Sequence, residues 1–333
     1  MSSPLLSVII PTADARRKDL LFQALDSLEK QDLDPSLFEV IIVTNYELVL
    51  TKPYSFRFKI VPTEIRRLGA KLVIGAENAT AEILALLEDD DIFYSDKLSH
   101  VVSIFLKNNG IGYYKSALSF ISYEGDQIQV NNFPDVRHGY YFAFGASLLK
   151  DISPSNIGNF YANVSSIVVK KEIIERNRVC ISKINFDSDL AIFLFAVDSN
   201  SGIYLDPTPH TKYRIHASGS RSTEHSLDKY SEFTESFVNN GISVAKDLLT
   251  CIKSKDVATL LQEIIARREL ELLRWRDIKI VCFANELMKY FRLTKPAHYD
   301  IRFVAIDIMF IFFPRTMRTL YMENNMRIIA NQQ

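Results

Sequence analysis

Apolar residues near the start of the chain follow two patterns that alternate. Short runs that are apolar almost throughout occur at Leu6–Ile10, Phe38–Val43, Phe58–Val61 and Ile83–Leu87. Such runs, rich in β-branched residues, are typical of strands buried on both faces. A one-sided helical pattern follows the first run at Asp19–Lys30, and Gly69–Leu84 is mostly helical. Strands that alternate with helices predict a parallel sheet covered by helices on both faces, an α/β fold.

The pattern changes after a helix predicted over Asp96–Lys107. Gly112–Phe144 is rich in Tyr and Phe, with short strand-like pieces between turn residues. The elements predicted beyond it are a strand at Ser165–Val169, helices at Lys171–Arg176 and Asp187–Val197, and an extended piece at Tyr213–His216. From about residue 232 onward the pattern is helical. We therefore expect an α/β core over residues 1–230 and a C-terminal helical extension over residues 231–333.

Composition and charge narrow the class of protein. The chain has 333 residues, 47% of them hydrophobic, which is enough for a large buried core. Its net charge of −1 provides no overall field, so we expect no nucleic-acid partner. Cys180, Cys251 and Cys282 lie too far apart for a metal motif, and we expect reduced, buried thiols, as in a cytosolic protein. The N-terminus lacks the features of a secretory signal, and no apolar stretch reaches the roughly 18 residues of a spanning helix.

Four consecutive acids, Glu88 to Asp91, directly follow the fourth apolar run. One interpretation is a solvated surface turn. A second is a site for a divalent cation, because Mg²⁺ and Mn²⁺ prefer carboxylate oxygens. Ligands of parallel sheets bind outside the carboxyl ends of the strands. Since the acids follow such an end, as do Thr12 and Asn45, their position favours the cation site.

Three stretches, in this order, resemble the donor half of an inverting family 2 glycosyltransferase of the GT-A fold. They are LSVIIPT, FEVIIV and GAKLVIGAENATAEILALLEDDDIFYSDKL, and EDDDIFYSDKL is the most specific match. The resemblance implies a catalytic domain with a donor half at about 1–110 and an acceptor half at about 111–230. It also implies transfer of a sugar from a nucleotide-diphosphate donor with inversion, and Mn²⁺ or Mg²⁺ as cofactor.

The resemblance assigns residues to the donor site. Asp90 matches the direct metal ligand, with Asp91 as a second ligand and Asp89 beside it. The positions expected to contact the nucleotide-sugar are Pro11, Thr12, Asn45, Lys71, Asp89, Asp91 and Arg221.

Two features depart from the family's pattern. The segment TNYE, from Thr44, replaces the usual pair of acids followed by Gly-Ser, which leaves Asn45 to bond a uracil or guanine edge. The usual Ala-Arg-Asn of the following helix is absent, and Lys71, or Arg66 or Arg67 before it, would supply the missing cation.

The acceptor half contains two further matches. NFDSDLAIFLFA resembles the segment that opens the family's acceptor helix, with Asp187 at the position of the catalytic base and Asp189 as the alternative base. From the residues alone, a helix N-cap explains these aspartates equally well. YRIHASGSRS resembles a segment whose histidine, here His216, completes the metal site, while Arg221 would neutralise phosphate charge.

The resemblance also implies partners. We expect a UDP- or GDP-linked donor, a glycan or lipid-linked acceptor, and a cytoplasmic location with possible peripheral contact to the membrane. The segment 300–328 is apolar and then basic, so it could lie in a membrane interface. A helix pair packed on the core is the commoner structure and is favoured. The oligomeric state is left open.

Two other functions fit part of the pattern. A nucleotidyltransferase also holds Mg²⁺ on carboxylates, but it usually has a Gly-rich loop after the first strand, and PTADARRKD has no glycine. A non-catalytic nucleotide-sugar-binding or scaffold protein on the same fold would suit the altered TNYE turn. Asp90 and Asp187 favour an enzyme over a scaffold, because a protein without activity needs neither.

Overall fold

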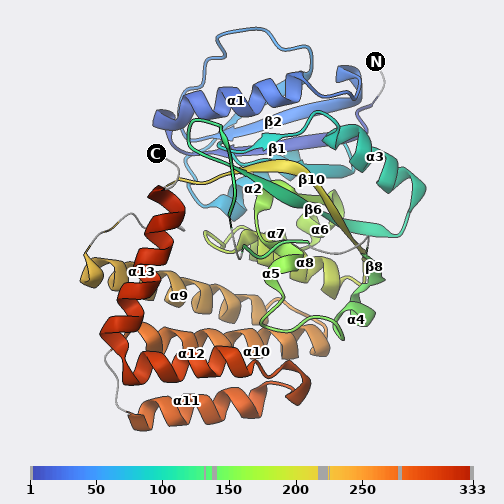
Figure 1. Cartoon of the computed structure of the whole chain (residues 1–333). Helices are drawn as coiled ribbons and strands as arrows, with labels where there is room; N and C mark the ends of the chain where they lie inside the picture. Colours follow the sequence, from blue (N-terminus) through green and yellow to red (C-terminus); the bar gives the residue numbers. More distant parts are fainter. Residues whose placement is uncertain are drawn as a thin grey trace. The chain divides into compact units, whose positions relative to one another are not determined.

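A computed structural model describes residues 3–130, 133–136, 141–216, 224, 226–276 and 280–330 (Figure 1). The chain divides into two compact units. Unit 1 comprises Met1–Ile121, Asn131–Lys150 and Gly158–Arg214, and unit 2 comprises Ser122–Val130, Asp151–Ile157 and Ile215–Gln333.

The strands of unit 1 are β1 (Leu6–Thr12), β2 (Phe38–Thr44), β3 (Arg57–Pro62), β4 (Ile83–Leu86), β5 (Ile92–Phe93), β6 (Ile111–Ile121), β8 (Tyr141–Phe144), β9 (Ile167–Lys170) and β10 (Gly202–Arg214). Its α-helices are α1 (Lys18–Glu29), α2 (Leu68–Asn78), α3 (Lys97–Lys107), α4 (Gly145–Leu148), α5 (Gly158–Tyr161), α6 (Lys171–Arg176), α7 (Arg178–Ile181) and α8 (Ser188–Asp198). Short 3-10 turns lie at Ala15–Arg17, Pro35–Leu37 and Val164–Ser166.

Unit 2 is mostly helical. Its elements are β7 (Gln127–Ile128), α9 (Leu227–Leu249), α10 (Lys255–Leu272), α11 (Ile280–Leu293), α12 (Ile301–Phe312) and α13 (Pro314–Ala330), with 3-10 turns at Leu273–Trp275 and Pro296–His298.

The strands of unit 1 form a mixed sheet in the order β3-β2-β1-β4-β9-β6-β10-β5, with β8 on β10. The first four strands run parallel, β9 is antiparallel to β4 and β6, and β10 is parallel to β6. Thr12 at the end of β1 lies opposite Thr44 at the end of β2. The carboxyl ends of β1, β2 and β4 therefore share one edge of the sheet, and the predicted α/β fold is confirmed.

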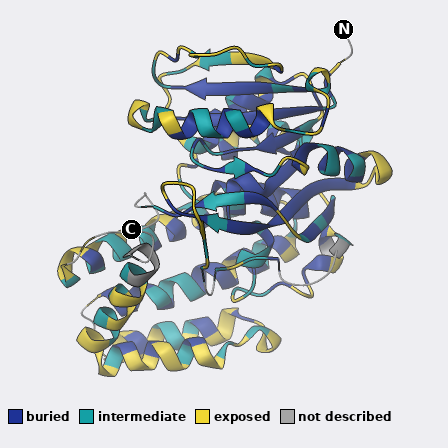
Figure 2. Ribbon diagram, turned by 45° about the horizontal axis from the view of Figure 1, so that its top comes forward, coloured by how far each residue is buried: buried dark blue, intermediate teal, exposed yellow. Residues whose placement is uncertain are grey.

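Side chains of β1 alternate between the two faces of the sheet, and helices cover both. Val8 and Ile10 belong to the core that β1 forms with α1 and α3. Ile9 points toward α2, so close that a Cβ added at Gly75 would lie 2.3 Å from its side chain. Figure 2 shows the resulting burial of the central strands, and all of β1 is buried. The run is apolar almost throughout because neither face meets water.

The sequence patterns miss most of β10. They predict extended chain only at Tyr213–His216, whereas the strand spans Gly202–Arg214. Two prolines and several polar residues interrupt its apolar pattern. The register shifts between Asp206 and Pro209 and again between Pro209 and Thr211, so the strand absorbs these residues as bulges.

The cysteines also differ from expectation. Cys180 and Cys251 are disulfide-bonded, and Cys282 is a free, exposed thiol. The prediction of three reduced and buried thiols is therefore wrong, and it carries no weight for the location of the protein.

The helices of unit 2 bury one face and expose another. Helix α10 packs against α9 and α11, and α12 buries Phe303, Asp307 and Phe310. The opposite faces of α11 and α12 appear exposed in Figure 2, with large apolar side chains at Ile280, Val281, Met288, Ile301, Met309, Phe312 and Phe313. Within the described ranges, no helix has the length and apolar character needed to cross a bilayer.

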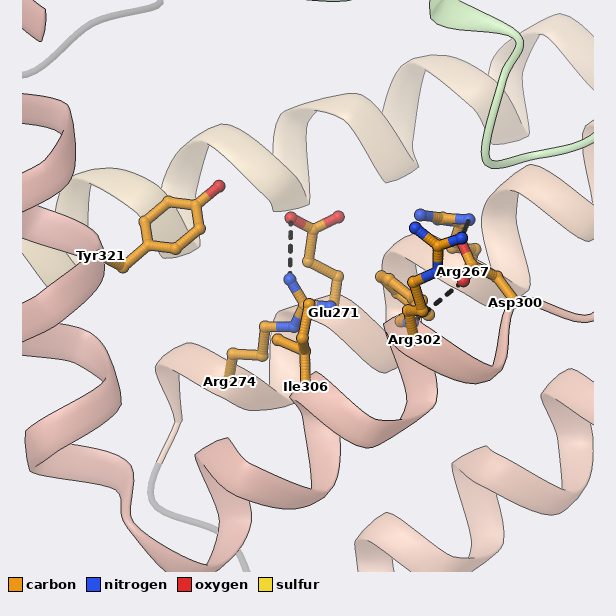
Figure 3. Close-up of a pocket in the computed structure, with 8 residues that line it drawn as sticks. Arg267, Glu271, Arg274, Asp300, Arg302, Ile306 and Tyr321 are labelled. Carbon is orange, nitrogen blue, oxygen red and sulfur yellow. Dashed lines mark hydrogen bonds and ion pairs between the residues drawn. The ribbon is translucent and has the colours of Figure 1, made fainter. Parts of the chain in front are cut away.

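A cavity of about 550 Å³ opens in unit 2 among residues of α10, α12 and α13 (Figure 3). It is lined by Arg267, Glu271, Arg274, Asp300, Arg302, Phe303, Ile306 and Tyr321. Its arginines are largely paired: Arg267 lies 3.4 Å from Asp300, and Arg274 donates to Asp307 at 2.5 Å. The mixed charges make this cavity a packing feature of the helical unit rather than a simple anion site.

Candidate active site

The acidic run lies at the carboxyl end of β4 and is mostly withdrawn from water. Asp89 is 2% exposed and Asp91 is fully buried, while Glu88 and Asp90 are half-buried. Burying a carboxylate costs free energy unless a cation or hydrogen bonds compensate it. The interpretation as a solvated surface turn is therefore wrong.

A cation from the turn after β1 reaches two of these acids. Arg17 Nη1 donates to Asp90 at 2.6 Å, and Arg17 Nη2 lies 2.8 Å from Asp89 Oδ1. Burial and the charge of Asp90 nevertheless outweigh Arg17 and raise the pKa of Asp89 to about 6. One arginine thus neutralises the two carboxylates incompletely.

Asp91 turns inward and is held by two donors. Its Oδ2 accepts from Asn163 Nδ2 at 3.0 Å, and its Oδ1 accepts from the backbone N–H of Arg214 at 2.8 Å. Burial, and then the charge of Asp90, still raise the pKa of Asp91 to about 7. Asp91 therefore anchors the acidic run to the fold, and its expected contact with a metal stays a prediction.

Asn163 joins the acidic run to the start of α8. While its side chain binds Asp91, its backbone N–H donates to Asp189 Oδ2 at 3.1 Å. The pKa of Glu88 is raised well above its ordinary value by burial, then by Asp90 and Asp91, and also by Asp189. The acids after β4 and the acids of α8 thus form one electrostatic cluster.

The two aspartates of α8 play different structural parts. Asp187 occupies the N-cap position with φ 57° and ψ 34°, and its side chain makes no capping hydrogen bond. Asp187 therefore stands at the N-cap position but does not cap the helix through its side chain. Asp189 accepts from the backbone N–H of Leu190 at 2.9 Å as well as from Asn163. Burial, and then Asp187, raise the pKa of Asp189 to about 7.

The residues expected to contact the nucleotide meet where β1 ends. Lys71 on α2 is buried and donates from Nζ to the carbonyl of Thr12 at 2.7 Å. The hydroxyl of Thr12 lies 3.2 Å from that of Tyr46, and Pro11 is buried beside it in β1. Burial lowers the pKa of Lys71 to about 8, against the opposing charge of Asp89.

The side chain of Asn45 holds the loop that follows β3 through its Nδ2, and its Oδ1 takes no part in that contact. Its Nδ2 donates to the carbonyls of Thr63 at 2.7 Å and Ile65 at 2.9 Å. Its Oδ1 is buried and has no hydrogen-bond partner among the described residues. Such an orphan costs about 1–3 kcal/mol, and the N–H of a nucleotide base could satisfy it.

The two remaining expected residues are His216 and Arg221. His216 belongs to unit 2, where its ring packs edge-on against Tyr123 with centroids 6.0 Å apart. Arg221 lies outside the described residues. The roles assigned to both stay predictions.

The donor set of the acidic run suits a hard divalent cation. It consists of carboxylate oxygens, which Mg²⁺ and Mn²⁺ prefer. Asp89 Oδ2 is buried and has no hydrogen-bond partner within the described part of the chain. Because the carboxylates have more charge than Arg17 neutralises, an added cation would stabilise them.

Arg17, Tyr46 and Asn163 belong to the site but were not expected there. Arg17 had a usable signal: it follows β1 in a basic stretch, and β1 pairs with β4, whose end carries the acids. Tyr46 stood in the altered TNYE turn. Asn163 had no signal, because it lies in irregular chain far from both of its partners.

Solved structures with the same fold define the class. TarS of S. aureus, residues 1–349, is 14% identical to this chain, and the two structures superpose with a TM-score of 0.56. The match covers 98% of this chain and 92% of the TarS chain. Its complex with UDP-GlcNAc gives the same TM-score, identity and coverage. A longer TarS structure matches with a TM-score of 0.53 at 14% identity. That match covers 55% of the longer TarS chain and 98% of this chain. The fold is therefore that of the GT-A class, with the helices of unit 2 added.

Sequence similarity to a known family covers part of the chain. The family model Glycosyl transferase family 2 matches residues 7–161. A glycosyltransferase of Haemophilus influenzae is 31% identical over 113 residues, which are 33% of this chain and only 37% of that protein. The part of the chain over residues 7–161 is therefore similar to glycosyl transferase family 2.

Proposed function

We propose that the chain transfers a sugar from a nucleotide-diphosphate donor to an acceptor hydroxyl with inversion at the anomeric carbon. The observation that carries the proposal is the double contact of Asn163, which binds Asp91 after β4 and Asp189 on α8. It brings the acids of the donor half next to the acids of the acceptor half. A transferase needs this arrangement, because the leaving diphosphate and the attacking hydroxyl meet at one sugar carbon.

In this proposal Asp187 is the general base. It accepts the proton of the acceptor hydroxyl as that oxygen bonds to the anomeric carbon and the bond to the nucleotide diphosphate breaks. Its side chain does not cap α8. Asp189 is the alternative base, although two backbone N–H groups already bind it.

Asp90, with Asp89, would hold Mn²⁺ or Mg²⁺, and the ion would stabilise negative charge on the departing diphosphate. Arg17 adds positive charge at the same carboxylates. His216 remains the candidate for a further ligand. The acidic donor set and the raised pKa of Asp89 support this assignment.

The donor is proposed to be UDP-linked in the first instance. The orphan Oδ1 of Asn45 can accept from the N3–H of uracil, and TarS, with a similar fold, has been solved with UDP-GlcNAc. A GDP-linked donor is the alternative, because guanine also presents N–H donors. Lys71 and Thr12 lie where the nucleotide would enter the edge of the sheet.

Calorimetric titration of UDP, with and without Mn²⁺, tests the donor site, and transfer of labelled sugar tests the reaction. Asp90→Ala should abolish the part of binding that depends on Mn²⁺. Asp187→Asn should keep binding but reduce turnover at least about 100-fold. Asp198→Asn, at the other end of α8, is the matched control and should leave both unchanged. Unaltered turnover in Asp187→Asn would remove its role as base, whereas metal-dependent binding without any transfer or hydrolysis would favour the scaffold protein.

We also propose peripheral membrane contact, which would suit a lipid-linked acceptor on the cytoplasmic face. Ile301, Phe312 and Phe313 are 81%, 64% and 55% exposed, and basic residues accompany them along 300–328. The protein should then sediment with anionic liposomes, and Phe312→Glu should reduce this. Leu106→Glu, at an equally exposed leucine of unit 1, is the control. Failure of the unaltered chain to sediment would refute the contact.

A further inference from the structure

Two histidines and an aspartate gather in unit 1 at residues that the proposed reaction does not use. His100 lies on α3, while Asp206 and His210 lie on β10. His100 Nε2 is 2.6 Å from Asp206 Oδ2, and His210 Nε2 is 3.6 Å from the same oxygen. The two imidazole rings stack with centroids 4.4 Å apart. One ligand atom from each of the three groups therefore lies within 4.8 Å of those of the other two.

The bulges of β10 create this arrangement. From Asp206 to Thr211 the strand advances five residues while its partner β6 advances only from Ser116 to Leu118. In a regular strand, residues four apart lie about 13 Å from each other. The extra residues shorten the path, so His210 approaches Asp206 closely. The prolines that interrupt the strand pattern of β10 in the sequence thus help to build the cluster.

His210 uses one of its two ring nitrogens in a hydrogen bond. His210 is 2% exposed, and its Nδ1 lies 3.1 Å from Asp96 Oδ1, where it donates its proton. Its Nε2 is buried and has no hydrogen-bond partner among the described residues. This nitrogen lies 3.6 Å from the carboxylate of Asp206, so a buried ring nitrogen without a hydrogen bond faces a carboxylate oxygen.

Asp206 is held in place by hydrogen bonds to both of its carboxylate oxygens. Tyr114 Oη donates to Oδ2 at 3.0 Å, and the backbone N–H of Thr208 donates to Oδ1 at 2.9 Å. The Asp206 side chain is fully buried, so it offers a rigidly held carboxylate oxygen.

We propose that His100, Asp206 and His210 form a binding site for a divalent transition metal of the zinc type. Two imidazoles and one carboxylate are ligands that Zn²⁺, Co²⁺ and Fe²⁺ accept, whereas Mg²⁺ prefers oxygen alone. Asp96 would be the outer partner that orients His210, as carboxylates commonly orient metal-binding histidines. His100 is 30% exposed and opens the site to solvent, which leaves room for a water as fourth ligand. This site is independent of the proposed transfer reaction and of the acidic run.

The distances fit such an ion after a small adjustment. With metal–ligand distances near 2.0–2.1 Å, neighbouring ligand atoms of a tetrahedral site lie about 3.3 Å apart. The 3.6 Å between His210 and Asp206 is close to this value. His100 would move outward by about 0.7 Å from its 2.6 Å contact, which its exposed side chain permits. The ion would then tie α3 to the bulged part of β10.

The test uses the whole chain, stripped with EDTA and kept in excess Mg²⁺ to occupy the acidic run. Co²⁺ is titrated by its visible absorption, and Zn²⁺ by competition with a chromogenic chelator. We expect one equivalent of either ion to bind. His100→Gln and His210→Gln should weaken binding at least about 100-fold, and Asp96→Asn should weaken it about tenfold. Asp90→Asn, which alters only the acidic run, should bind Co²⁺ as the unaltered chain does.

Several results would overturn the proposal. One is an unaltered chain that fails to bind Co²⁺ or Zn²⁺ stoichiometrically, which would leave a hydrogen-bonded cluster with His210 protonated on both nitrogens. Another is unchanged binding in both histidine variants, and a third is loss of binding in Asp90→Asn. Circular dichroism in EDTA checks folding. If His210→Gln does not fold, the partly exposed His100→Gln decides the outcome.

Discussion

Replacing Arg17 by Met is expected to destabilise unit 1 at pH 8 and to have little effect at pH 5. Arg17 contacts Asp90 at 2.6 Å and Asp89 at 2.8 Å, and Asp89 is 2% exposed. Met keeps much of the aliphatic bulk of the arginine and removes its charge. At pH 8 the variant leaves Asp89 and Asp90 beside each other without the charge of Arg17.

The magnitude follows from the pKa of Asp89. Burial and Asp90 raise it from 3.8 to about 6, although Arg17 opposes them. The folded state therefore binds this proton more tightly than the unfolded state does. The resulting stability is fully present below pH 3.8 and is lost as the pH rises through 6, by on the order of 3 kcal/mol.

Removing Arg17 raises the folded-state pKa of Asp89 further, so more stability is lost at pH 8. Breaking a buried ion pair costs about 3–5 kcal/mol. Arg17 is 32% exposed and Asp90 14% exposed, so solvent screening reduces this to roughly 2–3 kcal/mol. At pH 5 Asp89 is mostly protonated in both proteins, and the difference should fall below about 1 kcal/mol.

Urea unfolding at pH 5, 6.5 and 8 measures these differences by circular dichroism. Trp275 lies in unit 2, so its fluorescence reports on the other unit, and amide hydrogen exchange of β1 and β4 is the better local probe. Arg16→Met is the matched control, because Arg16 is 90% exposed and pairs with the partly exposed Asp14. It should change nothing measurable at any pH. Equal destabilisation of the Arg17 variant at pH 5 and pH 8 would refute the electrostatic reasoning.

Two further predictions concern packing and nucleotide binding. Gly69→Ala should cost about 3 kcal/mol in denaturant unfolding, because its Cβ would lie 2.0 Å from the carbonyl oxygen of Ile181. Gly110→Ala meets only the ring edge of Phe144 at 3.3 Å and should cost less than about 1 kcal/mol; equal costs would refute the steric explanation. Because the pKa of Lys71 is about 8, its charge is lost above that pH, and UDP affinity should fall up to about tenfold between pH 7 and pH 9. Lys71→Met should bind weakly without this dependence, and an identical pH profile in that variant would exclude Lys71 as its source.

The sequence predicts those parts of the fold that local patterns determine. Strands β1 and β2 are mostly buried on both faces, so their runs are largely apolar, and α6 begins and ends at the predicted residues. Strand β10 escapes prediction because bulges and prolines break its period. The pattern of side chains shows where an element lies, but it does not show which element a bulged strand will pair with.

The residues of the candidate site also divide into those that local sequence patterns reveal and those that they do not. The acidic run is visible because it follows an apolar strand at the binding edge. For Asp187 the sequence could not show whether its side chain caps α8, because that depends on its backbone and hydrogen bonds. Arg17 and Asp90 are 73 residues apart in the sequence, and Asn163 and Asp91 are 72 apart. Such contacts depend on strand order, which no short motif encodes.

Asn163 meets two separate requirements that together leave almost no choice of residue. Its φ of 78° is tolerated by Gly, Asn and Asp but strains other side chains. Its side-chain N–H must also reach the carboxylate of Asp91. Glycine meets the first requirement without the second, glutamine the second without the first, and aspartate would add another charge to a cluster already short of cations. In a library containing every substitution, position 163 should therefore be among the least permissive of unit 1, although it carries no charge and takes no direct part in the proposed reaction.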